Sequence, residues 1–246
     1  NRVQEFNPKG EYLAKFGTQG SSDGQFRFPT GIVADPAGNL WVTDNGNNRV
    51  EQFNYNGEYL GKFGSFRLAN LQFSSPAGIA VDPSGNLWVA DTFDNRVQEW
   101  RVPTTPTFAL TVGSRGSGNG QFVEPYDVAV DPSGDLWVVD TVNGRIQEFN
   151  SEGEYLSQVA TGGDPWGVAI DPAGNIWVSN LANDQVEEFN PKGELVRHFG
   201  TPGSGNGQFD VPTGIAVDPS GDLWVADTGN NRVQEFNPKG EYLAKF

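Results

Sequence analysis

An eight-residue phrase recurs along the chain at intervals of 40 to 49 residues. It reads Asp-Pro-(Ala/Ser)-Gly-(Asn/Asp)-(Leu/Ile)-Trp-Val, so each copy carries a Trp six residues after its opening Asp. Periods of this length are typical of repeat architectures, in which one small supersecondary unit is stacked many times. The five opening residues are Asp35, Asp82, Asp131, Asp171 and Asp218.

Each repeat predicts four short strands, and the last copy illustrates them. Residues 214–217 and 223–226 are apolar at nearly every position, which suits strands that are buried on both faces. Residues 232–236 and 241–246 alternate more, as expected of strands nearer a rim. The connections Asp-Pro-Ser-Gly and Asn-Pro-Lys-Gly share the chemistry of tight turns, because Pro presets φ and Gly accepts the strained position.

Four antiparallel strands in every repeat predict an all-β fold, a β-propeller of four-stranded antiparallel blades. A solenoid of parallel β-coils is the structural alternative, but it would need shorter coils without paired hairpin turns. We expect a single propeller over residues 1–246, closed as a ring of five or six blades. Its expected parts are a half-blade at 1–17 and full repeats at 28–64, 76–113, 125–160, 164–200 and 212–246.

Residues 1–16 and 231–246 are identical, and both contain only the last two strands of a repeat. Recent duplication in a repeat array and deliberate engineering both explain this identity. Because the chain begins within a repeat, we expect an excised or engineered segment. Residues 1–16 could pair with the inner strands at 212–228 and close a five-blade ring. Residues 231–246 would then be surplus and could form a strand-swapped homo-oligomer.

The run from Pro212 to Phe236 resembles the NHL repeat, and the similarity recurs five times. The resemblance implies a propeller, mostly six-bladed in that family, that binds proteins, RNA or other ligands. A few members of the family are lyases or hydrolases, so an enzymatic function is also implied as a possibility.

The acidic composition limits the partners. The formal net charge is −15, which disfavours binding to nucleic acid and to an anionic membrane surface. The chain has no Cys, so it has neither a disulfide framework nor a thiol nucleophile.

Four repeats carry an Asp and an Arg five residues apart, which could suggest catalysis. The fourth repeat has Asn180 and Gln185 at these positions, so both charges are lost together. A structural ion pair predicts this, because an unpaired buried charge is costly. The pairs are Asp44 with Arg49, Asp91 with Arg96, Asp140 with Arg145 and Asp227 with Arg232.

His198 is the only histidine, and its place on an outer strand predicts an exposed residue. A zinc site built from several histidines, as the lyase branch of the family uses, is therefore not expected. A Ser–His–Asp triad would depend on His198 alone. We expect no enzyme activity, no catalytic residue and no cofactor.

Asp127 stands where four repeats have Gly, near the expected channel mouth. Gluconolactonase-type propellers hold a divalent ion in the channel with acidic and Asn ligands. One inward Asp is weak evidence for calcium, which takes six to eight oxygen ligands. We therefore assign no metal ligand.

Departures from the repeat give the candidate ligand site. Large aromatic residues stand where other repeats have Thr or Ala, and they lie on the loop-rich face where propellers bind ligands. The alternative is that these rings only plug a tapering channel. The candidate residues are Tyr126, Asp127, Trp166, Phe93, Phe66 and Arg67.

Three functions remain open at this point. The first is a non-catalytic scaffold that binds a protein, peptide or glycan on the loop-rich face. The second is a hydrolase or lyase with an oxygen-ligated divalent ion in the channel. The third is an engineered repeat protein without a selected ligand.

Overall fold

The computed structural model describes residues 1–65, 72–103 and 105–246. These residues form two compact units, Asn1–Gly116 and Ser117–Phe246, and strands dominate both. Five four-stranded antiparallel sheets, the blades, confirm the predicted all-β class. No helix in the described ranges has the length and apolar character needed to cross a membrane.

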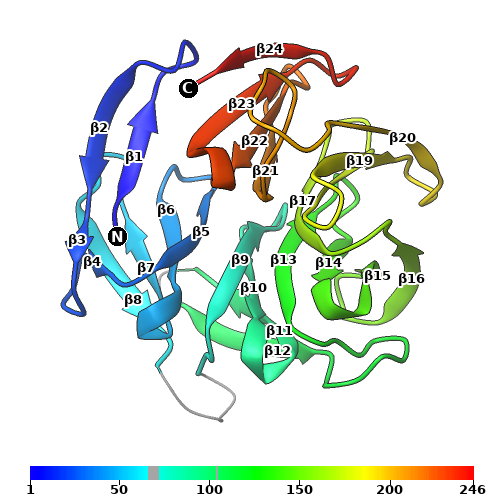
Figure 1. Ribbon diagram of the computed structural model, residues 1–246. Coiled ribbons are helices and arrows are strands. Elements are labelled where there is room, and N and C mark those ends of the chain that lie inside the picture. Colours follow the sequence, from blue (N-terminus) through cyan, green and yellow to red (C-terminus); the bar gives the residue numbers. More distant parts are fainter. Residues whose placement is uncertain (66–71, 104) are drawn as a thin grey trace. The chain divides into compact units, whose positions relative to one another are not determined.

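The N-terminal unit contains blades 1 and 2, which lie side by side through β5 and β9 (Figure 1). In each blade the four strands pair in chain order, so every connection is a simple antiparallel return. The strands of blade 1 are β5 (Pro29–Ala34), β6 (Leu40–Asp44), β7 (Arg49–Phe53) and β8 (Tyr59–Phe63). Those of blade 2 are β9 (Pro76–Val81), β10 (Leu87–Asp91), β11 (Arg96–Arg101) and β12 (Thr107–Val112).

The C-terminal unit contains blades 3, 4 and 5, in which β13, β17 and β21 are neighbours. Blade 3 comprises β13 (Pro125–Val130), β14 (Leu136–Asp140), β15 (Arg145–Phe149) and β16 (Tyr155–Ala160). Blade 4 comprises β17 (Pro165–Ile170), β18 (Ile176–Asn180), β19 (Gln185–Phe189) and β20 (Leu195–Phe199). Blade 5 comprises β21 (Pro212–Val217), β22 (Leu223–Asp227), β23 (Arg232–Phe236) and β24 (Tyr242–Lys245).

A 3-10 turn follows the second strand of four blades and reverses the chain into the third strand. The residue that follows this turn has a left-handed backbone, and it is Asn48 in blade 1 at φ +56° and Gly144 in blade 3 at φ +62°. Asn and Gly tolerate this region better than other residues do, which explains their place there. The four turns are η1 (Asn45–Asn47), η2 (Thr92–Asp94), η3 (Thr141–Asn143) and η4 (Thr228–Asn230).

The Asp-Pro turns between the first two strands are closed by the opening Asp. In blade 1, one oxygen of Asp35 accepts the backbone N–H groups of Ala37 and Asn39, each at 2.9 Å. Gly38 sits at φ +84°, a region that an L side chain rarely adopts. The other oxygen accepts the Asn39 amide at 3.1 Å and the Trp41 indole N–H at 3.0 Å.

Each unit has its own apolar core between blades. In the N-terminal unit the ring of Phe63, from the outer strand of blade 1, lies 4.4 Å from that of Trp100 in blade 2. In the C-terminal unit Phe199 of blade 4 lies 4.8 Å from Phe236 of blade 5. Outer strands therefore cover the neighbouring blade with aromatic rings, which are the largest apolar surfaces available.

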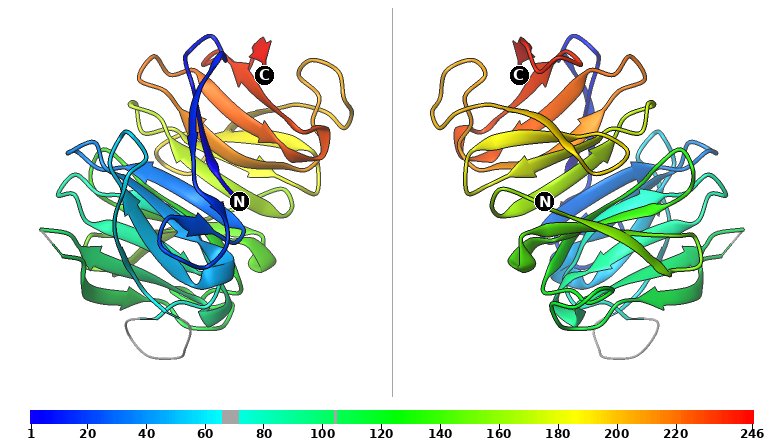
Figure 2. Two further views of the ribbon diagram at one scale, coloured as in Figure 1. Left: turned by 90° about the vertical axis from the view of Figure 1, so that its left-hand side faces the viewer. Right: turned by 90° about the vertical axis from the view of Figure 1, so that its right-hand side faces the viewer.

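The N-terminal half-blade is a two-stranded sheet of β1 (Val3–Phe6) and β2 (Tyr12–Phe16), the dark blue ribbon in Figure 2. Phe16 packs on Phe53 of blade 1 at 4.7 Å, as Phe199 packs on blade 5. A short parallel pair, β3 (Thr18–Gln19) and β4 (Gln25–Phe26), leads into β5.

The expected pairing of residues 1–16 with the inner strands at 212–228 is wrong. Instead, β22 pairs with β23 and β23 with β24, so residues 231–246 complete blade 5 in the order β21-β22-β23-β24. The physical reason is local connection. A short turn joins β22 to β23, so that pairing costs far less chain entropy than a pairing across more than 200 residues.

Candidate functional site

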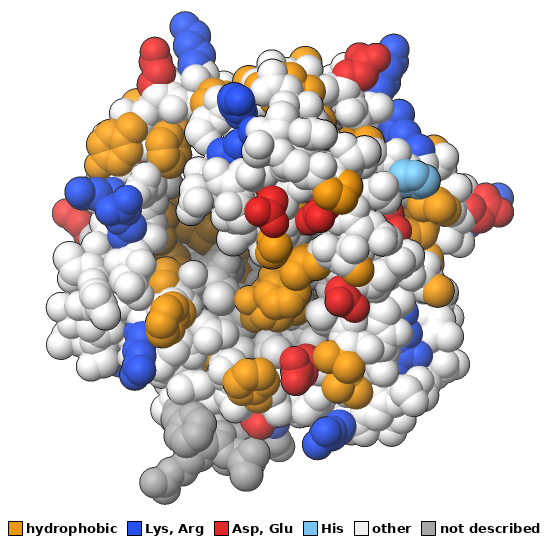
Figure 3. Space-filling view, in the orientation of Figure 1, with side chains coloured by type: hydrophobic (Ala, Val, Ile, Leu, Met, Phe, Trp, Pro, Cys, Tyr) orange, Lys and Arg blue, Asp and Glu red, His pale blue; other side chains and the backbone are white. Residues whose placement is uncertain are grey.

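Two aromatic side chains meet at the start of the innermost strands of blades 3 and 4. Tyr126 follows Pro125 in β13, and Trp166 follows Pro165 in β17. Their ring centroids are 3.8 Å apart with an interplanar angle of 39°, and both residues are half-buried. Figure 3 shows hydrophobic side chains gathered on this face, over the region of β13 and β17. The rings thus form one apolar surface that solvent still reaches.

Asp127 joins the same two blades. One carboxylate oxygen accepts the N–H of Val128 at 2.9 Å, and the other accepts the N–H of Val168 in β17 at 3.0 Å. Burial raises the pKa of Asp127 to about 7, and these two backbone donors oppose the shift only in part. The carboxyl group therefore exchanges its proton near neutral pH.

Hydroxyl groups make the equivalent links elsewhere in the chain. Thr43 in β6 donates to the carbonyl of Ala77 in blade 2 at 2.6 Å. Ser179 in β18 donates to the carbonyl of Thr213 in blade 5 at 2.5 Å. Blade 3 has Val139 at that position of its second strand, so its link to blade 4 comes from Asp127 instead.

The other candidate ligand residues do not join this cluster. Phe93 lies in η2 of the N-terminal unit and is 61% exposed. Phe66 and Arg67 fall outside the described residues. The structure thus brings together Tyr126, Asp127 and Trp166, the three candidates in the C-terminal unit.

The repeated Asp–Arg pairs form structural clamps. In blade 1, Arg49 Nε donates to Asp44 at 2.8 Å, and its Nη2 donates to the carbonyls of Ser22 and Gln25 in the preceding loop. Asp44 also accepts the N–H of Arg27 from that loop at 2.6 Å. The same Arg–Asp contact recurs at 2.6 to 2.7 Å in blades 2, 3 and 5.

The fourth blade lacks the clamp because it lacks the loop that the clamp holds. Only residues 161–164 separate β16 from β17. Glu187 takes over, accepting the N–H of Gly162 at 3.1 Å and the side-chain amide of Asn180 at 3.3 Å. The 40-residue spacing from Asp131 to Asp171 was the sequence signal for this shortened loop.

His198 is exposed on β20, as expected from its place on an outer strand. Its cross-strand partner is Glu187, and no zinc-type group of His residues can form around a single His.

Within the described ranges, one group of acidic residues has the spacing of metal ligands. Ligand atoms of Asp131, Asp135 and Glu148 all lie within 4.8 Å of one another. The group lies at the Asp-Pro turn of blade 3 and does not include Asp127. We missed it in the sequence because we treated Asn and Asp as equivalent at the fifth position of the turn phrase.

The NHL repeat family matches residues 26–53, 73–100, 122–149 and 209–236. The chain belongs to the NHL-repeat β-propeller family. The matched ranges of the NHL repeat end at the third strand of blades 1, 2, 3 and 5, the four blades that carry the Asp–Arg clamp. No curated protein matches the sequence.

Solved structures similar to this NHL chain share its fold at low identity. Virginiamycin B lyase from Staphylococcus aureus has 17% identity and a TM-score of 0.65, over 89% of this chain and 69% of the lyase. A gluconolactonase from Xanthomonas campestris has 19% identity and a TM-score of 0.71, over 90% and 76%. A protein of unknown function from Bacteroides caccae has 14% identity and a TM-score of 0.73, over 100% and 89%.

Proposed function

We propose that this chain is a non-catalytic binding module and that a polypeptide segment of its partner packs on Tyr126 and Trp166. The observation that carries the proposal is the 3.8 Å contact between these half-buried rings. Thr30 and Thr213 occupy the same position in blades 1 and 5, so the fold itself does not require aromatic rings there. Aromatic anchors of this kind dominate the energetics of protein interfaces.

The surroundings favour a polypeptide over a glycan or a nucleic acid. Val142, which lies in η3 after β14 at the same end of blade 3, is 59% exposed, so this end of the blade presents a further apolar side chain. Both carboxylate oxygens of Asp127 already accept backbone N–H groups, so this residue is partly engaged within the fold. The net charge of −15 opposes a polyanionic ligand.

A peptide-display selection on the whole chain tests the proposal. A selected peptide should lose at least about tenfold in affinity for Trp166→Thr and for Tyr126→Thr, since a hot-spot aromatic contributes more than about 1.4 kcal/mol. Both variants carry the residue that blades 1 and 5 use, so their thermal unfolding should stay close to that of the wild type. Phe93→Ser is the matched control, an exposed aromatic residue outside the cluster.

Two results would contradict the binding proposal. One is a selection that enriches no peptide. The other is enriched peptides that bind all three variants as well as they bind the wild type. A glycan array is run in parallel. If binding that depends on Trp166 is found only on this array, the ligand is a saccharide and not a polypeptide.

Asp127 favours a second candidate, a hydrolase or lyase. A carboxyl group with a pKa of about 7 is suited to proton transfer. Asp127 directly follows Tyr126 in β13, and it accepts the N–H of Val168, two residues after Trp166 in β17. The similar solved structures include a lyase and a gluconolactonase, which adds to this candidate. Lactone hydrolysis that is lost in Asp127→Asn while folding is retained would support it, and absence of turnover with lactone and macrocyclic ester substrates would count against it.

A further inference from the structure

The Asp-Pro turn of blade 3 and the strands beside it differ from those of blade 4 at two positions that, in blade 4, supply a partner to a carboxylate near the turn. In blade 4, Asn175 donates its amide to Asp171 at 2.8 Å, and Trp177 donates its indole N–H to the same carboxylate at 3.3 Å. Arg197 on the outer strand pairs with Glu188 at 2.5 Å. Every carboxylate at that turn therefore has a cation or an N–H donor beside it.

Blade 3 loses these partners one by one. Asp135 replaces the Asn, so a carboxylate faces Asp131 where an amide donor stood. Ser157 stands opposite Glu148, where blade 4 has Arg197, and supplies one neutral hydrogen bond at 2.6 Å. Burial raises the pKa of Asp135 and of Glu148, and repulsion from the Asp131 carboxylate adds to both shifts. The cluster thus carries negative charge that its neighbours do not neutralise.

A second and independent feature points into the same place. Trp137 lies directly across the β14–β15 ladder from Glu148 and is only 2% exposed. Its indole nitrogen is buried and has no hydrogen-bond partner among the described residues. A buried N–H without a partner costs about 1–3 kcal/mol, so native structures normally supply one.

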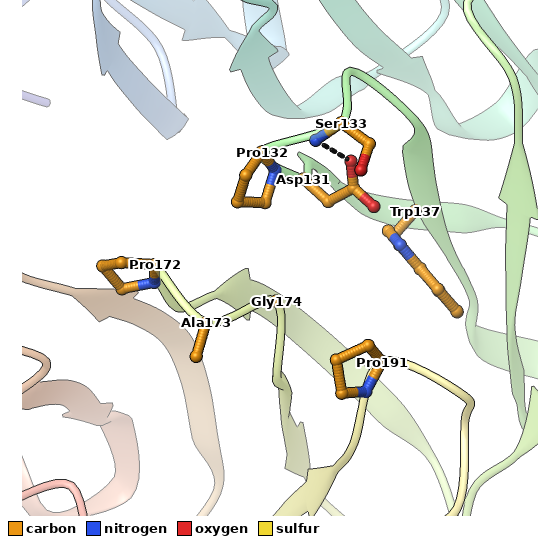
Figure 4. A pocket seen from close by; sticks show the side chains of 8 residues that line it. All are labelled: Asp131, Pro132, Ser133, Trp137, Pro172, Ala173, Gly174 and Pro191. Carbon is orange, nitrogen blue, oxygen red and sulfur yellow. Dashed lines mark hydrogen bonds between the residues drawn. The ribbon is translucent and has the colours of Figure 1, made fainter.

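Trp137 and Asp131 line a recess of about 170 Å³ between the Asp-Pro turns of blades 3 and 4. Figure 4 shows the indole nitrogen of Trp137 at the end of its ring that is nearest Asp131. Oδ1 of Asp131 accepts the backbone N–H of Ser133. The remaining lining comes from Pro172, Ala173, Gly174 and Pro191, with Pro132 and Ser133. This space has room for an ion with several waters, given about 30 Å³ for each water.

We propose that Asp131, Asp135 and Glu148 bind one calcium ion, and that a water on the ion accepts the indole N–H of Trp137. The ligand set is all oxygen, which a hard cation prefers. A spread of at most 4.8 Å between ligand atoms suits an ion whose bonds are 2.3–2.6 Å long. Waters in the recess complete the six to eight ligands that calcium takes.

Thermal unfolding of the whole chain, after chelation and with added calcium chloride, tests the site. At a calcium concentration about tenfold above Kd, the Tm should rise by about 3 °C. Asp135→Asn, which gives blade 3 the Asn of blade 4, should abolish this rise and should increase the Tm measured without calcium. The variant should therefore lose calcium binding while its calcium-free Tm rises, and this combination separates loss of the site from loss of folding.

Terbium luminescence gives a second readout, because a tryptophan beside a bound lanthanide sensitises its emission. Emission from the wild type should be displaced by calcium and lost in Asp135→Asn. Blade 5 carries similar residues, Asp218, Asp222 and Glu235, so all measurements are repeated in the Asp222→Asn background. A wild type without any calcium response, or an Asp135→Asn variant that responds like the wild type, would overturn the proposal.

Discussion

Glu51 Oε1 lies 3.3 Å from Nη2 of Arg49, while Glu51 Oε2 is buried without a hydrogen-bond partner among the described residues. Burial raises the pKa of Glu51 to about 7, although the Arg49 guanidinium opposes the shift. Blades 2, 3 and 5 have Gln at this position. In blade 3, Gln147 donates to the carbonyl of Gln121 at 2.8 Å and accepts the N–H of Gly120 at 3.0 Å.

Replacing Glu51 by Gln should therefore stabilise the chain. The amide can donate to the carbonyl of Gln25 and still accept the N–H of Gly24, which Glu51 accepts at 3.2 Å. Satisfying one buried polar atom should contribute about 1–2 kcal/mol at pH 7.5, or a rise in Tm of about 2–6 °C. Calorimetry measures this rise. Gln147→Glu is the mirror control and should lower Tm, and a fall in Tm for Glu51→Gln would contradict the argument.

Asp127 should make stability depend on pH. Its folded pKa of about 7 lies above the ordinary value of 3.8, so between these values the folded state holds a proton that the unfolded state has lost. The contribution of this group is present in full below about pH 4 and is lost as pH rises to 7, by at most about 1.4 kcal/mol per pH unit. Urea unfolding from pH 4 to 8 should show a flatter profile for Asp127→Asn.

That comparison is made in the Glu51→Gln background, because Glu51 shifts in the same direction. Parallel profiles for the two proteins would show that Asp127 has an ordinary pKa.

Removing the Arg of a clamp should cost more than removing the uncharged residue at the same position of blade 4. Arg145→Ala leaves Asp140 buried without its cation and removes the hydrogen bonds to the carbonyls of Gly118 and Gln121. We expect a loss of about 3–5 kcal/mol in the free energy of unfolding. Gln185→Ala, at the same position of blade 4, should cost less than about 1 kcal/mol. Equal losses of unfolding free energy for the two variants in urea would contradict the structural role that we assign to the clamp.

The two identical terminal segments should differ in their importance. Deleting residues 231–246 removes β23 and β24 and with them the buried Phe236, so blade 5 should melt well below the wild type. Deleting residues 1–16 removes a separate two-stranded sheet and should leave the five blades folded. Circular dichroism melts compare the two proteins. Equal Tm values would mean that residues 1–16 can replace the lost strands on β22.

The strands were predictable because turn chemistry marks them in every copy. Asp, Pro and Gly at fixed positions mark the turn between the first two strands of each repeat. In blade 1 the structure closes this turn through the carboxylate of Asp35 and the left-handed backbone of Gly38. The strand pairing of residues 1–16 was not predictable. These residues are identical to 231–246, so the sequence does not show which of the two segments pairs with the inner strands at 212–228. The chain entropy of the connection decides between them.

The candidate site was only partly predictable. Tyr126 and Trp166 hold the same position in adjacent repeats, so their proximity followed from the period. The contact between the rings, and the two hydrogen bonds that tie Asp127 to the backbone, depend on how the blades pack. The acidic group at Asp131 escaped notice because one oxygen in place of one nitrogen hardly changes a turn signature, yet it reverses the electrostatics.

The loop clamp has a consequence for how the molecule comes apart. Arg49 holds a loop that lies more than twenty residues before it in the sequence and ahead of β5, so the cooperative unit begins in that loop and not at the first strand of the repeat. Boundaries drawn by sequence homology and boundaries drawn by local unfolding are therefore offset from each other. Blade 4, whose short loop is held by Glu187 in place of an Asp–Arg clamp, is where we expect hydrogen exchange to be fastest.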